Sequence, residues 1–150
     1  TGIVYANGLR LLPYFVLALA VAFGARFYIR CFMFVERKFS ASSAPGWARV
    51  VLGGLMTGLL GLLMPEALGT SYSVIQKTLS GETLTIAALL AFFFIKVIAT
   101  SCTVGSGGSG GVFAPALVCG GVLGAAVGLA FARVLPASFG IQPTAFALVA

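Results

Sequence analysis

The residues that could do chemistry gather in one glycine-rich stretch, "VGSGGSGGVFAPALVCGG", at positions 104–121. Gly105, Gly107 and Gly110 fit the spacing G-x-G-x-x-G, in which backbone N–H groups hold a dinucleotide phosphate. That kind of site needs a preceding strand and an acidic residue about 20 positions further on. No Asp or Glu follows Glu82, and no Lys-Ser or Lys-Thr completes a Walker A loop. A phosphate-binding loop of a soluble enzyme is therefore disfavoured.

The same stretch could instead hold an anion inside a membrane. Each glycine costs a helix up to about 1 kcal/mol relative to Ala, so "GSGGSGG" predicts a break between helices. Such a break supplies backbone N–H groups with no side chains in the way. A helix that starts directly afterwards, with Pro115 in its first turn, adds unpaired N–H donors and a partial positive charge. The alternative is that these glycines serve only the close packing of helices.

The composition indicates that lipid is much of the solvent of this chain. Hydrophobic residues make up 60% of the 150 and charged residues only 8%, and the mean hydropathy is +1.12. Soluble domains are about a quarter charged. A chain this apolar could not cover a water-facing surface, so we expect membrane-spanning helices.

The charges predict an orientation more than a partner. The net charge is +6, and more than half of the basic residues lie in or before the loop at 36–49, which the positive-inside rule places in the cytoplasm. The segment at 65–82 would then lie outside. Nucleic-acid binding is disfavoured because no basic stripe alternates with exposed aromatics. The basic residues around the loop are Arg26, Arg30, Arg37, Lys38 and Arg49.

Cysteine and histidine usage gives no support to a metal site. Cys31, Cys102 and Cys119 lie far apart in or beside apolar runs, which indicates that they are small buried hydrophobic residues. The chain has no His and no paired Cys, so a structural zinc site is not expected. Lys96 lies within an apolar run, where backbone carbonyls or other parts of the protein must serve as its partners.

The hydropathy pattern predicts an all-α, polytopic membrane protein. We expect about five membrane helices and one short interfacial helix near 73–79, all within one transport domain. Glycines four residues apart predict close helix contacts at Gly54 and Gly58, and again along Gly120, Gly124 and Gly128. We expect the chain to be a piece of a longer protein. The apolar runs lie at 11–35, 50–64, 84–101, 112–135 and from 143 or 144 onward.

The segment "GVFAP" at 111–115 resembles the G-x-F-x-P motif of the CLC family of chloride channels and proton-coupled chloride exchangers. The resemblance is strongest over 93–128 and extends weakly to nearly the whole chain. It implies that the backbone amides of Val112 and Phe113 help to hold a dehydrated chloride. It also implies that residues on either side shape the turn: Gly105, Gly107, Gly108, Gly110, Gly111, Ala114 and Pro115.

The resemblance further implies an inverted-repeat fold in which this chain opens the second repeat, and a homodimer of the complete protein. The other anion-binding segments of the family, its gating glutamate and its later tyrosine have no match here. Glu36, Glu66 and Glu82 match neither the gating glutamate nor the proton-coupling one.

The expected function is chloride movement across a membrane, as a channel or a proton-coupled exchanger, and not an enzymatic reaction. Chloride would be the transported ligand, with no cofactor, and the remaining partners would be the lipid bilayer and the rest of the polypeptide. The expected location is the cell membrane of a prokaryote. Two alternatives stay open: a secondary transporter for another small anion, and a membrane scaffold that transports nothing.

Overall fold

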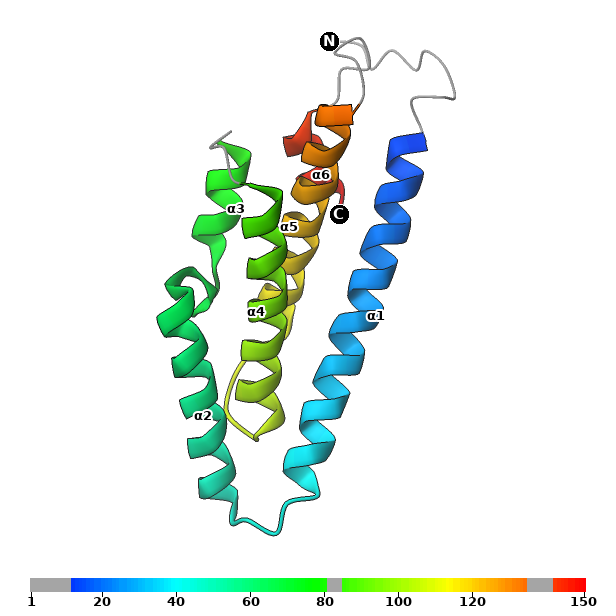
Figure 1. Cartoon of the computed structure of the whole chain (residues 1–150). Coiled ribbons are helices and arrows are strands. Elements are labelled where there is room, and N and C mark those ends of the chain that lie inside the picture. Colours follow the sequence, from blue (N-terminus) through cyan, green and yellow to red (C-terminus); the bar gives the residue numbers. More distant parts are fainter. Residues whose placement is uncertain (1–11, 81–84, 135–141) are drawn as a thin grey trace.

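The computed structural model of the chain describes residues 12–80, 85–134 and 142–150 (Figure 1). Within these residues, four helices are long and apolar enough to cross a membrane, namely α1, α2, α4 and α5. This all-helical arrangement confirms the predicted fold class. The elements are α1 (Leu12–Ser40), α2 (Gly46–Leu63), the short 3₁₀ helix η2 (Pro65–Ala67), α3 (Tyr72–Leu79), α4 (Ile86–Gly105), α5 (Phe113–Val134) and α6 (Pro143–Val149).

The central pair of helices is α4 and α5. Helix α4 contacts α1, α2 and α5, and Figure 1 shows it between α1 and α2. Its side chains Leu89 and Val97 are buried against Val118 and Val122 of α5. Helices α1 and α2 instead present most of their apolar side chains outward. The bundle therefore has a packed centre and an apolar outer surface, as a membrane-embedded protein requires.

Several of the predicted helix boundaries differ from the observed ones. Helix α1 continues beyond position 35 to Ser40. Glu36 is a good helix former, and the basic Arg37 and Lys38 stand in the last turn, where they complement the helix dipole. Helix α2 begins already at Gly46, so the loop before it is shorter than predicted. The predicted end points at 11, 82, 84 and 135 lie outside the described residues.

Helix α4 also extends further than its apolar run, to Gly105. Thr85 caps its start, because the Thr85 side chain accepts a hydrogen bond from the backbone N–H of Ala88 at 3.2 Å. Near its end, Ser101 Oγ donates to Val97 O at 2.7 Å. This bond satisfies the hydroxyl within the helix, so a polar residue at depth does not end it.

The glycines of α5 make the close helix contact that their spacing predicts. A Cβ on Gly128 would lie 2.8 Å from the Cα atom of Pro143, and one on Gly120 would lie 3.0 Å from Ala150 O. Gly124 is closest of all, because its added Cβ would collide with Phe146 O. Helix α6 therefore packs on this face of α5.

The corresponding prediction for α2 is wrong within the described residues. A Cβ on Gly54 or Gly58 would meet nothing within 4 Å of it. The close approach is made one position earlier, where a Cβ on Gly53 would lie 2.6 Å from Cys102 O of α4. Helix α2 is thus rotated so that Gly53, and not the Gly54 face, meets its neighbour.

Substituting Gly124 by Val should lower the thermal stability of the complete protein. The larger side chain cannot fit against Phe146, and such overpacking costs about 1–3 kcal/mol or more. Ala130→Val on the same helix is the matched control, because Ala130 is exposed. Thermal unfolding in detergent should show a clear drop in Tm for the first variant only; equal Tm values would contradict the packing.

Candidate functional site

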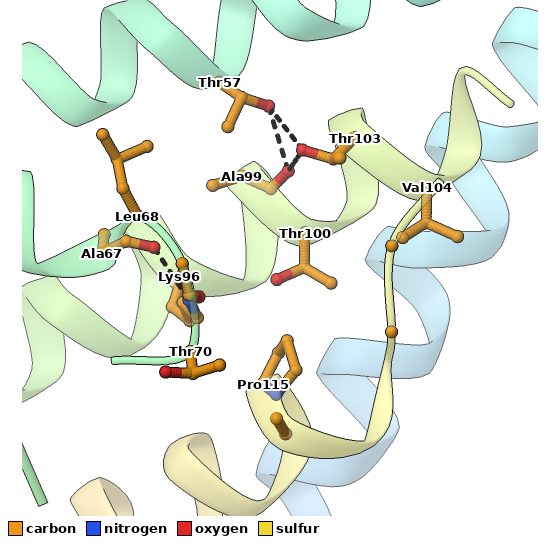
Figure 2. Close-up of a pocket in the computed structure, with 14 residues that line it drawn as sticks. Thr57, Ala67, Leu68, Thr70, Lys96, Ala99, Thr100, Thr103, Val104 and Pro115 are labelled. Atoms are coloured by element: carbon orange, nitrogen blue, oxygen red, sulfur yellow. Dashed lines mark hydrogen bonds between the residues drawn. The ribbon is translucent and has the colours of Figure 1, made fainter. Parts of the chain in front are cut away.

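A cavity of about 370 Å³ lies where four segments of the chain meet (Figure 2). Helix α2 contributes one threonine, the turn between η2 and α3 a short run, and α4 one face. The glycine-rich segment and the first turn of α5 close the remaining side. The lining residues are Thr57, Ala67, Leu68, Gly69, Thr70, Lys96, Ala99, Thr100, Thr103, Val104, Gly110, Gly111, Ala114 and Pro115.

The glycine-rich segment turns back along α4, so α5 does not start level with the end of that helix (Figure 1). The turn is closed by two backbone bonds, from Gly107 N to Val104 O at 3.0 Å and from Gly108 N to Thr103 O at 3.1 Å. Pro115, in the first turn of α5, lines the same cavity as Thr100 in the body of α4. The start of α5 therefore lies partway along the bundle.

Two glycines of this turn have a specific steric reason to be glycine. Gly107 has φ 93°, a left-handed conformation that other residues rarely adopt. A Cβ on Gly108 would lie 2.6 Å from Thr103 O. A Cβ on Gly105 would lie 3.2 Å from the nearest atom and one on Gly110 3.1 Å, which leaves little room. A Cβ on Gly111 would meet nothing within 4 Å. The expectation that Gly111 shapes the turn therefore finds no steric support; the tight bend is at Gly107 and Gly108.

Val112 and Phe113 stand at the N-terminus of α5, as predicted. The Ala116 N–H donates to Val112 O at 3.1 Å, which is the first hydrogen bond of the helix. The N–H groups of Phe113 and Ala114 precede it and have no partner within the helix, and Pro115 has no N–H. Val112 and Phe113 are 44% and 79% exposed, and neither residue belongs to the cavity lining. Gly111 and Ala114, the residues on either side of this pair, do line it, so the first turn of α5 borders the cavity.

Three polar groups join α2 to α4 on the cavity wall (Figure 2). Thr57 Oγ1 is 2.8 Å from Thr103 Oγ1 and 3.2 Å from Ala99 O, and Thr103 Oγ1 donates to Ala99 O at 2.9 Å. Each hydroxyl proton therefore has an acceptor in the protein. The lone pairs of Thr57 remain available to a water or a ligand donor.

Lys96 is the one lysine in the lining, and its partners are now identified. Its side chain is only 2% exposed. The ammonium Nζ donates to Ala67 O at 2.8 Å, to Gly69 O at 2.5 Å and to Ser71 Oγ at 2.8 Å. The expectation that backbone carbonyls serve Lys96 is confirmed, and the carbonyls belong to the turn that precedes α3.

Sequence reasoning missed the polar wall on α4, although a signal for it was present. Lys96, Thr100 and Thr103 are separated by four and three residues, so they share one face of a helix. A run of polar residues on one face of a membrane helix marks a face that avoids lipid. Thr57 and the turn at Ala67–Thr70 carry no comparable pattern, because tertiary contact alone brings them here.

The cysteines add no ligand to this site. Cys102 and Cys119 are buried in the core, Cys31 is half-buried, and all three are free thiols. Among the described ranges, no group of His, Cys, Asp or Glu side chains could hold a metal ion. What the cavity offers chemically is a cation and the N-terminal turn of a helix, a set that suits a small anion.

Several curated proteins with similar sequences are named as bacterial chloride channels or exchangers. A protein of Ralstonia nicotianae named as a ClcB-like chloride channel protein is 33% identical over 147 residues, which is 97% of this chain and 33% of the relative. The H(+)/Cl(-) exchange transporter ClcA of Yersinia pestis is 42% identical over 106 residues, 68% of this chain and 22% of the relative. No solved structure gives a significant match.

The chain thus spans a third or less of the length of these curated relatives. Its helices are those of an integral membrane protein. The family described as voltage gated chloride channel matches residues 3–150, which is nearly the whole sequence. The chain therefore belongs to the voltage gated chloride channel family.

Proposed function

We propose that the complete protein moves chloride across a membrane, and that residues 1–150 form part of its transport domain. The observation that carries this proposal is the start of α5 beside a largely apolar cavity whose lining includes Lys96 and four threonines. The relatives named as a chloride channel and as H(+)/Cl(-) exchange transporters support chloride as the cargo. Both mechanisms, channel and exchanger, are represented among them.

The backbone amides at Val112 and Phe113 are proposed to hold the anion in part. A helix N-terminus offers unpaired N–H donors and a partial positive charge, without a cationic side chain that would hold the anion too tightly. Conduction requires binding that is weak enough for release. Both residues are exposed and their neighbours Gly111 and Ala114 line the cavity, so recognition would be left to the main chain.

The finer expectations on the assembly remain proposals of the same kind. The complete protein is proposed to be a homodimer in the cell membrane of a prokaryote, with the basic loop between α1 and α2 in the cytoplasm. No cofactor is needed, because moving an anion involves no bond making. Transport of another small anion is the alternative, since main-chain donors recognise charge and size more than chemical identity.

Bromide should bind beside the first turn of α5. Bromide resembles chloride in charge and size, and its anomalous scattering identifies it in a crystal of the complete protein. The expected result is an anomalous peak within hydrogen-bonding reach of the Val112 or Phe113 N–H. Peaks found only elsewhere, with this turn packed dry against side chains, would rule out the amide site.

A methyl group should be far more harmful on Gly108 than on Gly111. Gly108→Ala sets a Cβ against Thr103 O and displaces the turn that places α5, whereas Gly111→Ala meets no atom within 4 Å. Because a misplaced binding group commonly costs about a hundredfold in rate, we expect chloride flux through Gly108→Ala to be at least about tenfold below that of Gly111→Ala. The measurement is chloride efflux from liposomes at equal protein content. Equal flux in the two variants would contradict the placement of the turn.

Residues 1–150 expressed alone should not conduct chloride. They cover a third or less of the relatives, and several residues of the glycine-rich segment are exposed in the chain by itself. Facing lipid, each unsatisfied backbone group there would cost several kcal/mol. Liposomes carrying the purified fragment should release chloride no faster than protein-free liposomes. Selective efflux would mean that the pathway is complete within these residues.

A further inference from the structure

The strongest unexplained feature of the molecule is a lysine buried among neutral partners. Lys96 lies in the middle of α4, among apolar residues, and its ammonium group faces the turn before α3. A charged side chain at membrane depth is costly and is therefore rarely kept without a function. The proposed amide site does not use it.

The hydrogen bonds of Lys96 exhaust its donors. An ammonium group has three N–H donors and no acceptor. Ala67 O, Gly69 O and Ser71 Oγ take one donor each, at 2.8, 2.5 and 2.8 Å. An anion in the adjacent cavity therefore cannot receive a hydrogen bond from Lys96 unless the turn opens.

The turn is built to keep those donors occupied. Ser71 is buried and has φ 60°, an uncommon left-handed conformation for a residue other than glycine, and Gly69 has φ 64°. Ser71 Oγ also donates to Glu66 O at 2.6 Å, which orients its lone pairs toward Lys96. The backbone is thus bent so that two carbonyls and one hydroxyl converge on a single ammonium.

The formal charge of Lys96 is not cancelled by this arrangement. All three partners are neutral, whereas a carboxylate partner would have removed the field of the ammonium. Glu66 belongs to this turn, but its side chain is exposed and only its backbone carbonyl takes part, as an acceptor for Ser71 Oγ. Lys96 lines the same cavity as Gly110, Gly111 and Pro115 at the start of α5.

We propose that Lys96 is a positioning residue and that it acts on the anion through its charge alone. The turn at 65–71 occupies its three N–H donors, so the ammonium attracts an anion into the cavity without donating a hydrogen bond to it. Attraction through space raises the local anion concentration, and the missing hydrogen bond keeps release fast. This inference rests on the proposed function, since the anion of interest is the one that the complete protein moves.

The test compares two removals of the same charge in the complete protein. Lys96→Gln removes the cavity charge and keeps an amide that can donate to the turn. Lys77→Gln makes the same change on the exposed surface of α3, outside the cavity lining. Chloride binding is measured by calorimetry in detergent and chloride flux in liposomes. We expect Lys96→Gln to raise Kd and the apparent KM for chloride about tenfold, with little change of flux at saturating chloride, and Lys77→Gln to raise neither.

Further variants keep the inference falsifiable if Lys96→Gln does not fold. Thr70 is exposed on the cavity wall, so Thr70→Asp adds an opposing charge while the lysine and its partners stay in place. Thr70→Asp should bind chloride about tenfold more weakly than the isosteric Thr70→Asn. Lys96→Arg, which keeps the charge, should bind chloride with about the wild-type affinity.

The outcomes separate this inference from the proposed function. Unchanged chloride affinity in Lys96→Gln, or equal affinities for the two Thr70 variants, would overturn the role of the charge while leaving chloride transport intact. Lowered stability and flux with unchanged Kd would likewise overturn it, because that result fits a purely structural lysine. Wild-type protein that binds chloride but shows no flux would refute transport and leave the charge effect measurable.

Discussion

A backbone group that leaves the helical ladder inside an apolar bundle must find a partner, because no bulk water is available to it. This chain leaves the ladder twice at the same cavity, once between α2 and α3 and once between α4 and α5. At the first break, carbonyl oxygens turn inward and a buried ammonium satisfies them. At the second, the unpaired groups are the N–H donors at the start of a helix. One break is thus closed by the protein itself, and the other leaves N–H donors for the anion that we propose binds there.

The glycines of the second break have different roles at different positions. Gly107 takes a backbone conformation that favours glycine, and Gly108 passes too close to α4 for any side chain. Together they reverse the chain within a few residues and bring it back beside the helix it has just left. Without that reversal, α5 would begin at the edge of the bundle, where water would compete for its free amides. The glycine content is therefore needed for the depth at which α5 starts.

Much of the fold could be predicted from the sequence, since long apolar runs define the helices and glycine spacing defines the contact between α5 and α6. The helix ends could not, because hydroxyl groups such as Ser101 Oγ bond back to their own helix and allow it to continue past an apolar run. For the site, the motif located the start of α5, but the partners of Lys96 lie 25 to 29 residues away in sequence. The Thr57–Thr103 pair is 46 residues apart. Such contacts depend on the rotation of α2 about its own axis relative to α4, which no local sequence pattern predicts.

The hydrogen bonds between the Pro65–Ser71 turn and α4 also impose an order on biogenesis. Ala67 and Gly69 leave the ribosome before Lys96, so their carbonyls lack their final hydrogen-bond donor until α4 has been made. Conversely, Lys96 must enter the membrane close to a segment that already awaits it, since an unpaired ammonium there is costly. Helix α2, the turn and α4 are therefore best inserted as one unit. If a translocon released α2 into lipid alone, the carbonyls of the turn and the ammonium of Lys96 would both be left without their hydrogen-bond partners.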